Sequence, residues 1–234
     1  MKAMVFAAGR GTRLRPLTDA RPKALVEVGG QTLLERVMER LVEAGVTEVV
    51  INLHHLGEQI PPFIEQHGRF GLRRVAYSDE PVLLGTGGGL KQAAWFFDDG
   101  EPFLGHNADV LSTIDLGALL LAHRRCGALA TLAVMARPTA RPLYFDARGR
   151  LVGRRTADGR DELVRASDGA ITPLGFCGIQ AVSPALFERM IETGAFGIAE
   201  AYLRLAGAGE TIHAHRVDGA KWRDCGRPED LRPL

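Results

Sequence analysis

Short apolar runs alternate with segments of helical period through the first half of the chain. Four such runs occupy residues 4–6, 46–53, 72–78 and 102–107. Between the first two, residues 32–45 place apolar side chains on one helical face and end at Gly45, a residue typical of helix C-termini. Strands that alternate with helices indicate an α/β fold, so the pattern predicts a doubly wound, largely parallel sheet.

Two further segments read as helices. Residues 56–68 have the helical period, but Pro61 and Pro62 cannot both lie in a helix interior. That helix must therefore start late or kink at the prolines. Residues 88–97 predict a second helix, directly after a run of glycines.

The second half of the chain is richer in strands. Residues 130–136, 171–182 and 211–218 are the candidates. They predict an extension that makes the sheet mixed. The polar stretch 146–169 is a candidate for a mobile segment. Without an internal repeat or a low-complexity linker, we expect a single domain over 1–234, with halves at 1–125 and 126–234.

Composition narrows the class of protein. The 234 residues are 46% hydrophobic and 24% charged, enough for a sizeable core. A net charge of +1 argues against general nucleic-acid binding. Three widely spaced cysteines without a C-x-x-C predict neither a disulfide framework nor a zinc site. No apolar run could span a membrane and no signal peptide is present, so we expect a cytoplasmic protein that binds neither nucleic acid nor membrane.

The first apolar run leads into a glycine-rich loop with Gly9, Gly11 and Arg13, followed by Lys23. Glycines leave backbone N–H groups free to converge on phosphate oxygens, and the two cations suit a polyanion. The Rossmann fingerprint is incomplete, because Leu14 occupies its third glycine position, and no G-x-x-x-x-G-K-[ST] motif occurs. From the loop alone, a phosphate cradle and an ordinary tight turn with solvated arginines both stay open.

Residues 85–89, a second glycine-rich segment, precede the helical pattern at 88–97. Such a backbone can press against a flat base and ribose, with the helix N-terminus adding positive potential. A flexible turn is the alternative.

Asp109 lies near the end of the predicted strand at 102–107, and Asp224 lies 115 positions later. Mg²⁺ is commonly held by one or two carboxylates together with substrate phosphates, so two such residues suffice for a site. A single aspartate after a strand is more often a cap or turn residue, and that interpretation stays open for each one taken alone.

Four segments together resemble the sugar-nucleotide pyrophosphorylases, the nucleotidyltransferases that make nucleoside-diphosphate sugars. They are FAAGRGTRLRPLT with PKAL, LLGTGGGLKQA, HNADV and WRDCGRPEDL. They lie in the family's order and cover nearly the whole chain. The resemblance implies a Rossmann-like, doubly wound mixed sheet of the glycosyltransferase-A-like nucleotidyltransferase type.

The resemblance also implies a role for each motif residue. Catalysis would rest on Arg13 and Lys23, and Mg²⁺ would be the cofactor on Asp109 and Asp224. The expected nucleotide-binding residues are Ala8, Gly9, Gly11, Thr12, Arg13, Glu80 (or its neighbour Asp79), Thr86, Gly87 and Gly88. The expected sugar-binding residues are Asn107, Gly175 and Gly178. Ala108 stands where the family usually has glycine, which puts the local backbone conformation in question.

The implied reaction joins a nucleoside triphosphate to a sugar 1-phosphate and releases pyrophosphate. Short members of the family with a GTGGG segment resemble uridylyltransferases acting on N-acetylmuramate 1-phosphate in cell-wall recycling, and this is the reaction we expect. The alternatives are guanylyltransferases acting on mannose or heptose 1-phosphate, and a catalytically silent protein that binds sugar nucleotides. The lactyl carboxylate of muramate would favour a nearby cation, which Arg141, Arg154 or Arg155 could supply. The sequence does not predict the oligomeric state.

Overall fold

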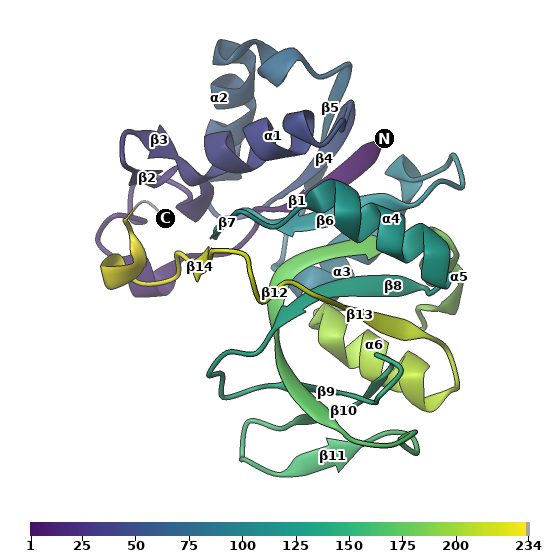
Figure 1. Ribbon diagram of the computed structural model, residues 1–234. Helices are drawn as coiled ribbons and strands as arrows, with labels where there is room; N and C mark the ends of the chain where they lie inside the picture. Colours follow the sequence, from purple (N-terminus) through teal and green to yellow (C-terminus); the bar gives the residue numbers. More distant parts are fainter. Residues whose placement is uncertain (233–234) are drawn as a thin grey trace.

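A central ten-stranded sheet runs through the molecule (Figure 1). The computed structural model describes residues 1–232. The parallel part of the sheet consists of β1 (Lys2–Phe6), β4 (Glu48–Leu53), β5 (Arg74–Asp79) and β6 (Phe103–Asn107). β1 lies between β6 and β4, with β5 beyond β4. The strand order therefore reverses direction at β1, and the carboxyl ends of β1 and β6 form the edge where open α/β sheets bind ligands.

The second half of the chain continues the same sheet. Its strands are β8 (Ala130–Met135), β9 (Leu143–Phe145), β10 (Leu151–Arg155), β11 (Asp161–Leu163), β12 (Thr172–Val182) and β13 (Ile212–Arg216). β12 is antiparallel to β6 and joins the two halves, whereas β13 is parallel to β8. Two small sheets pair β2 (Glu27–Val28) with β3 (Gln31–Thr32) and β7 (Val110–Ser112) with β14 (Trp222–Asp224). The predicted mixed sheet is confirmed.

Helices cover both faces of the sheet. They are α1 (Leu33–Glu43), α2 (Ile60–Gln66), α3 (Gly85–Gln92), α4 (Leu116–Cys126), α5 (Ala185–Arg189) and α6 (Ile198–Gly207). Alternate residues of β1 point to opposite faces: Ala3 and Val5 pack in a core with α1, α2 and α4, whereas Met4 packs in a core with α3 and α6. This arrangement confirms the doubly wound α/β prediction.

Local sequence explains where the helices begin and end. The side chain of Thr32 accepts the N–H of Glu35 at 3.1 Å, and the Glu35 carboxylate accepts the N–H of Thr32 at 3.3 Å. This capping box fixes the start of α1, and Gly45 follows its end with a φ of +84°. α2 begins at Ile60, with Pro61 and Pro62 in its first turn, where their missing N–H groups cost nothing. The predicted late start is therefore confirmed.

The glycine run at 85–89 differs from the expected loop, because it forms the first turns of α3. Gly88 packs so tightly that an added Cβ would lie 2.6 Å from the carbonyl oxygen of Gly194. At Gly89, a Cβ would lie 2.5 Å from Oε1 of Glu80. The glycines thus serve close packing within a helix, which overrides their low helix propensity.

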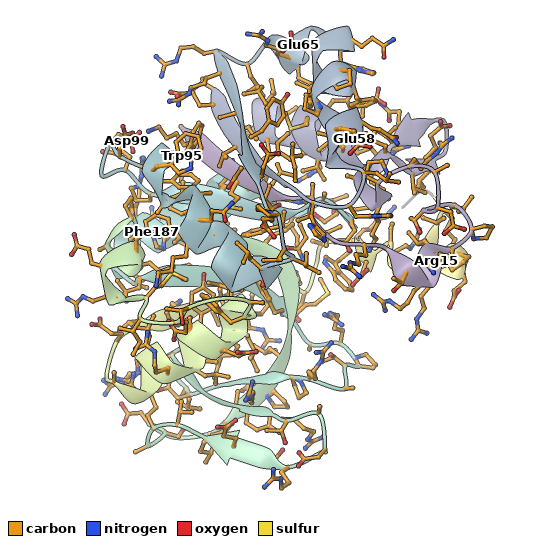
Figure 2. The ribbon with its side chains drawn as sticks, turned by 180° about the vertical axis from the view of Figure 1, so that it is seen from behind. Arg15, Glu58, Glu65, Trp95, Asp99 and Phe187 are labelled. Atoms are coloured by element: carbon orange, nitrogen blue, oxygen red, sulfur yellow. The ribbon has the colours of Figure 1, made fainter. Side chains whose placement is uncertain are left out.

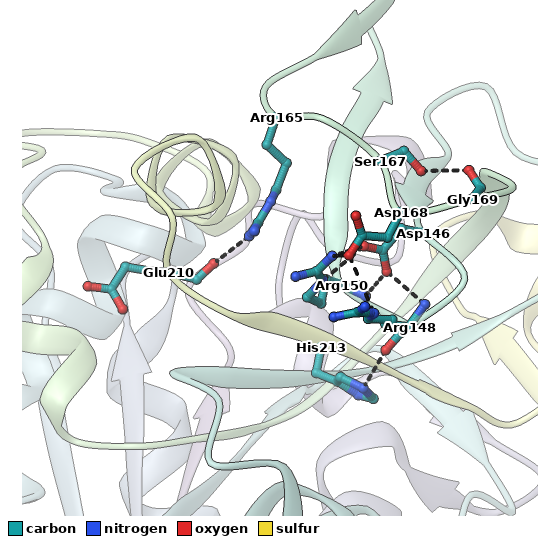
Figure 3. A network of polar contacts seen from close by, with 9 residues as sticks. All are labelled: Asp146, Arg148, Arg150, Arg165, Ser167, Asp168, Gly169, Glu210 and His213. Atoms are coloured by element: carbon teal, nitrogen blue, oxygen red, sulfur yellow. Dashed lines mark hydrogen bonds and ion pairs between the residues drawn. The ribbon is translucent and has the colours of Figure 1, made fainter.

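The polar stretch 146–169, a candidate for mobility, contains an ordered hairpin instead. β10 and β11 pair in antiparallel register, and ion pairs Arg154–Glu162 (2.8 Å) and Arg155–Asp161 (2.9 Å) link them. Buried Asp146 anchors the turn before β10 by accepting the N–H groups of Arg148 and Arg150 at 2.9 Å (Figure 3). Local ion pairs give this polar segment the order that its few apolar residues cannot.

Other surface features lie away from the β1 loop. Trp95, half exposed, follows α3 and lies across the molecule from Arg15, which is on the loop after β1 (Figure 2). Over residues 1–232, the helices are too short or too polar to cross a membrane. Cys126, Cys177 and Cys225 are free thiols.

Candidate active site

The loop after β1 presents an open backbone. Its start is fixed by Ala7, whose N–H donates to Oδ1 of Asn52 at 2.7 Å. Within residues 1–232, no hydrogen bond occupies the N–H groups of Gly9, Arg10 or Gly11. A Cβ built on Gly9 would meet nothing within 4 Å, so this part of the loop faces open space. Unpaired N–H groups at an open loop are what a phosphate group needs.

Lys23 lies under this loop at the start of a 3₁₀ turn. Gly11, with a φ of +61°, packs so closely that an added Cβ would lie 3.0 Å from Cβ of Lys23. The Lys23 side chain is only 11% exposed, and its Nζ donates to Oδ2 of Asp109 and lies 4.0 Å from Oδ1 of Asp224. The predicted catalytic lysine therefore contacts both predicted metal ligands.

Strand pairing brings the two aspartates together although they are far apart in sequence. β14 is antiparallel to β7, and this register places Asp224 opposite Val110. The N–H of Cys225 donates to the carbonyl oxygen of Asp109 at 2.8 Å. Gly226 follows, and a Cβ there would lie 2.7 Å both from Oδ1 of Asp224 and from Nη2 of Arg13. All four predicted reactive residues thus meet at one place.

The charges around the aspartates fit a divalent cation. Asp224 is about half exposed, but its partial burial raises its pKa and the neighbouring Asp109 carboxylate raises that pKa further, although Lys23 and Arg13 oppose the shift. Two carboxylates that disfavour each other's charge gain most from a cation between them. No cluster of three or more His, Cys, Asp or Glu side chains suited to a metal occurs in residues 1–232. The donor set therefore matches an ion that completes its shell with water and phosphate oxygens.

Ala108 poses no problem at the first aspartate. It is buried, its N–H donates to the carbonyl oxygen of Phe6 at 3.0 Å, and among residues 1–232 the positive-φ non-glycine residues are elsewhere. An alanine therefore fits this backbone without strain.

A hollow of about 220 Å³ opens beside these charges at the carboxyl ends of β1 and β6. Five of the predicted residues line it: Ala8, Gly9, Thr86, Asn107 and Asp109. A smaller hollow next to it is lined by Gly9, Lys23 and Asp109. The open space, the free N–H groups and the cations together have the chemistry that a phosphorylated ligand requires.

Comparison with known proteins identifies the family. The model of the nucleotidyl transferase family matches residues 2–145, which include the β1 loop, Lys23 and Asp109. The chain belongs to the nucleotidyl transferase family.

Relatives of this nucleotidyl transferase include two named N-acetylmuramate alpha-1-phosphate uridylyltransferase. The one from Caulobacter vibrioides is 36% identical over 97% of this chain and 92% of its own length. The one from Neisseria meningitidis is 48% identical over 50% of this chain and 51% of its own length. That match therefore spans about half of the relative. A protein named probable mannose-1-phosphate guanylyltransferase 1, from Oryza sativa, is 30% identical over 98% of this chain and 62% of its own length.

The fold of the nucleotidyl transferase is shared with solved structures. HddC from Yersinia pseudotuberculosis is 20% identical, with a TM-score of 0.77 over 98% of this chain and 95% of HddC. The likeness confirms the glycosyltransferase-A-like fold predicted for the whole chain.

The structure places several predicted nucleotide-binding residues outside the hollow. Glu80 is buried: its Oε1 accepts from Nδ2 of Asn52 at 2.7 Å and its Oε2 accepts the N–H of Leu84 at 2.9 Å. Gly87 and Gly88 are buried against the segment around Phe196. Thr12 is exposed in the 3₁₀ turn Thr12–Leu14, whereas Asp79, the alternative to Glu80, is an exposed strand end. Glu80, Gly87 and Gly88 therefore pack behind the hollow, whereas Thr12 and Asp79 lie at the surface outside it.

The predicted sugar-binding residues also differ in whether they lie near the hollow. Gly178, with a φ of +72°, lies against Asn107, since a Cβ there would be 2.7 Å from Nδ2 of Asn107. Gly175 is covered by Arg137, whose Nε would lie 2.7 Å from an added Cβ. Asn107 therefore lines the hollow and Gly178 lies against Asn107, whereas Gly175 lies behind Arg137.

Sequence reasoning missed Asn52, Leu83 and Phe6, which also line the hollow. A signal was available for Asn52, because it is a polar residue within a buried apolar run that ends at the ligand-binding edge. No comparable signal marks Leu83 or Phe6, whose apolar side chains look like ordinary core or surface residues.

Proposed function

We propose that this protein transfers the uridylyl group of UTP to N-acetylmuramate 1-phosphate, forming UDP-N-acetylmuramate and pyrophosphate. The observation that supports this substrate pair best is the match to the Caulobacter uridylyltransferase over 97% of this chain and 92% of that protein. The oxygen of the sugar phosphate bonds to the α-phosphorus as the bond from that phosphorus to the β-phosphate oxygen breaks. The attack needs no general base, because the phosphate nucleophile is already ionised at neutral pH.

Catalysis of this transfer is a matter of holding two polyanions together. Arg13, exposed and close to Gly226 beside Asp224, is our candidate to bind the triphosphate, assisted by the free N–H groups of Gly9 and Gly11. Lys23 is placed to bridge the two reacting phosphates, because it lies under the loop with its Nζ between the two aspartates. The loop backbone and Lys23 already lie next to both aspartates, which lowers the cost of organising the transition state.

Asp109 and Asp224 are the residues that would hold Mg²⁺. When bound, the ion would offset charge on the reacting phosphates. Because Lys23 ion-pairs with Asp109, we expect it to exchange this partner for phosphate when the substrates bind. Asn107 and Gly178 are our proposed sugar contacts, and Ala8, Gly9 and Thr86 our proposed nucleotide contacts.

The second candidate is a GTP-dependent mannose 1-phosphate guanylyltransferase, favoured by the Oryza relative that aligns with 98% of this chain. The reacting groups would be the same in that case. Only the base and the sugar would differ.

The reaction would take place in the cytoplasm, where three free thiols remain reduced.

Pyrophosphate release tests the proposal. The purified protein with Mg²⁺ is given UTP or GTP, each with N-acetylmuramate, N-acetylglucosamine, glucose or mannose 1-phosphate. We expect the highest kcat/KM with UTP and the muramate ester. A preference for GTP with mannose 1-phosphate would replace the substrates but keep the reaction. Nucleotide binding without any release would contradict catalysis and leave a silent sugar-nucleotide-binding protein.

Arg13→Ala provides the site-specific test, with Arg15→Ala as a matched control. Arg15 is two residues along the same loop, exposed, and ion-paired with Asp19 at 3.2 Å (Figure 2). We expect Arg13→Ala to reduce kcat/KM on the order of 100-fold, as for loss of one preorganised charge contact, and Arg15→Ala to change it little. Equal effects would mean that only the general charge of the loop matters.

A further inference from the structure

A second, larger hollow of about 430 Å³ adjoins the proposed sugar site. Two segments of the protein border both hollows. On one wall, Phe176 lines the second hollow two residues before Gly178 on β12, and Gly178 contacts Asn107 of the first. On the other wall, Thr86 of the first hollow accepts the N–H of Ile198 at 3.0 Å, next to Gly197 of the second. A substituent on a sugar held at Asn107 can therefore extend into the second hollow.

Three arginines line this hollow: Arg141, Arg154 and Arg155. Arg154 and Arg155 are held by the carboxylates of Glu162 and Asp161 on β11, each through its Nε. Arg141 differs from them. In the part of the chain that the structure describes, its exposed guanidinium has no hydrogen bond or ion pair, and only its backbone N–H is engaged, with Oγ1 of Thr139 at 3.3 Å.

Glu200 is the acidic residue among those that line the hollow. It lies in the first turn of α6, and its Oε1 would be 3.6 Å from a Cβ on Gly197, so the carboxylate folds back over the start of its own helix. The positive end of the helix dipole partly offsets its charge there. The Arg141 charge is thus the one left for a ligand.

We propose that this hollow binds a carboxylate substituent of the sugar, and that Arg141 is the residue that selects an acidic sugar over a neutral one. This inference rests on the proposed function, in which the sugar carries a lactyl carboxylate. Guanidinium groups bind carboxylates with two parallel hydrogen bonds, and Phe176 offers an apolar surface for the lactyl methyl group. Arg154 and Arg155 are already paired with Glu162 and Asp161, so they do not compete with Arg141 for the ligand carboxylate.

The test compares two sugars that differ only in the lactyl ether: N-acetylmuramate 1-phosphate and N-acetylglucosamine 1-phosphate. KM and kcat for each are measured with UTP for the wild type, Arg141→Ala and Arg141→Lys. The control is Arg160→Ala, which removes an equal charge from the turn between β10 and β11, at a residue that pairs with Asp158 (2.6 Å) outside the hollow.

We expect Arg141→Ala to raise KM for the muramate ester about tenfold, equivalent to about 1.4 kcal/mol, with kcat and the glucosamine KM unchanged. Arg141→Lys should restore part of the loss, because it keeps the charge but not the forked geometry. Equal changes for both sugars, no change, or the same change in Arg160→Ala would overturn the inference while leaving the proposed function intact. A wild-type enzyme that rejects the muramate ester but uses a neutral sugar would instead overturn the proposed function, and this inference with it.

Discussion

Asn52 offers a sharp test of how the site is held together. Its side chain joins the β1 loop to the glycine segment: Oδ1 accepts the N–H of Ala7, and Nδ2 donates to Glu80, whose other oxygen accepts the N–H of Leu84. The first two contacts are each 2.7 Å long, and Asn52 and Glu80 are each 3% exposed. Asn52→Ala therefore breaks two hydrogen bonds in a buried network.

The magnitude follows from what the substitution leaves behind. An unpaired buried N–H costs about 1–3 kcal/mol, and a hydrogen bond to a charged group contributes about 1.5–3 kcal/mol. Because Asn52 also lines the hollow, water can partly replace its side chain, so we expect a total loss of about 2–4 kcal/mol in the free energy of unfolding. For a chain of this size, that loss lowers Tm by roughly 5–15 °C.

Urea denaturation and thermal melts measure the loss, with Gln92→Ala as a matched control. Gln92 is also an amide beside the end of β5, where its Nε2 donates to the carbonyl oxygen of Asp79 at 2.6 Å, but it is exposed. Its removal should cost less than about 1 kcal/mol. Asn52→Ala should also lower kcat/KM for UTP, because the loop loses its anchor. If Asn52→Ala destabilises no more than Gln92→Ala, the reasoning about this network is wrong.

Three further predictions follow from single residues. Lys23→Ala should lower kcat on the order of 10²- to 10³-fold in a pyrophosphate-release assay. Lys221 is exposed, and its replacement by alanine should leave kcat unchanged. Equal activity of the two variants would remove Lys23 from the mechanism. Gly89→Ala should destabilise the fold by about 1–3 kcal/mol in urea denaturation, because the added Cβ would lie 2.5 Å from the Glu80 carboxylate. Wild-type stability of this variant would mean that α3 and the Glu80 side chain can move apart freely. Burial would raise the pKa of Asp146, but hydrogen bonds from Arg150 and Arg148 outweigh it and lower that pKa. The ionised carboxylate thus stabilises the fold above the unfolded pKa of about 4, and this contribution is lost as pH falls through the lower folded pKa. Asp146→Asn should therefore destabilise at pH 7 by about 1–3 kcal/mol and less at pH 3 in urea denaturation, and a pH-independent difference would contradict the assignment.

Short-range patterns predicted much of the fold and named residues that the structure brings together. The apolar runs gave the parallel strands, and the prolines at 61 and 62 gave the late start of α2, because these depend on neighbouring residues. Lys23, Asp109 and Asp224 could be named from motifs, although their meeting depends on the pairing of β7 with β14, which no local pattern encodes.

The remaining features depend on contacts between distant segments. The glycines at 85–89 predicted a loop, yet they form the first turns of α3. Gly194, Phe196 and Glu80 lie too close to them for any side chain, so this part of the helix requires glycine. Glu80 read as a ligand contact, but a partner 28 residues earlier holds its carboxylate inside the protein. The polar sequence of the β10–β11 hairpin predicted a mobile segment. Its order comes from ion pairs between the two strands, which a local pattern does not reveal.

The most direct measurement of the central claim is pyrophosphate release from UTP and N-acetylmuramate 1-phosphate with Mg²⁺, by the wild type and Asp224→Asn side by side. The wild type should release pyrophosphate only when both substrates are present. Asp224→Asn should fold normally, since the side chain is about half exposed, and lose activity on the order of 10³-fold. Full activity in Asp224→Asn, or no release by the wild type, would contradict the account.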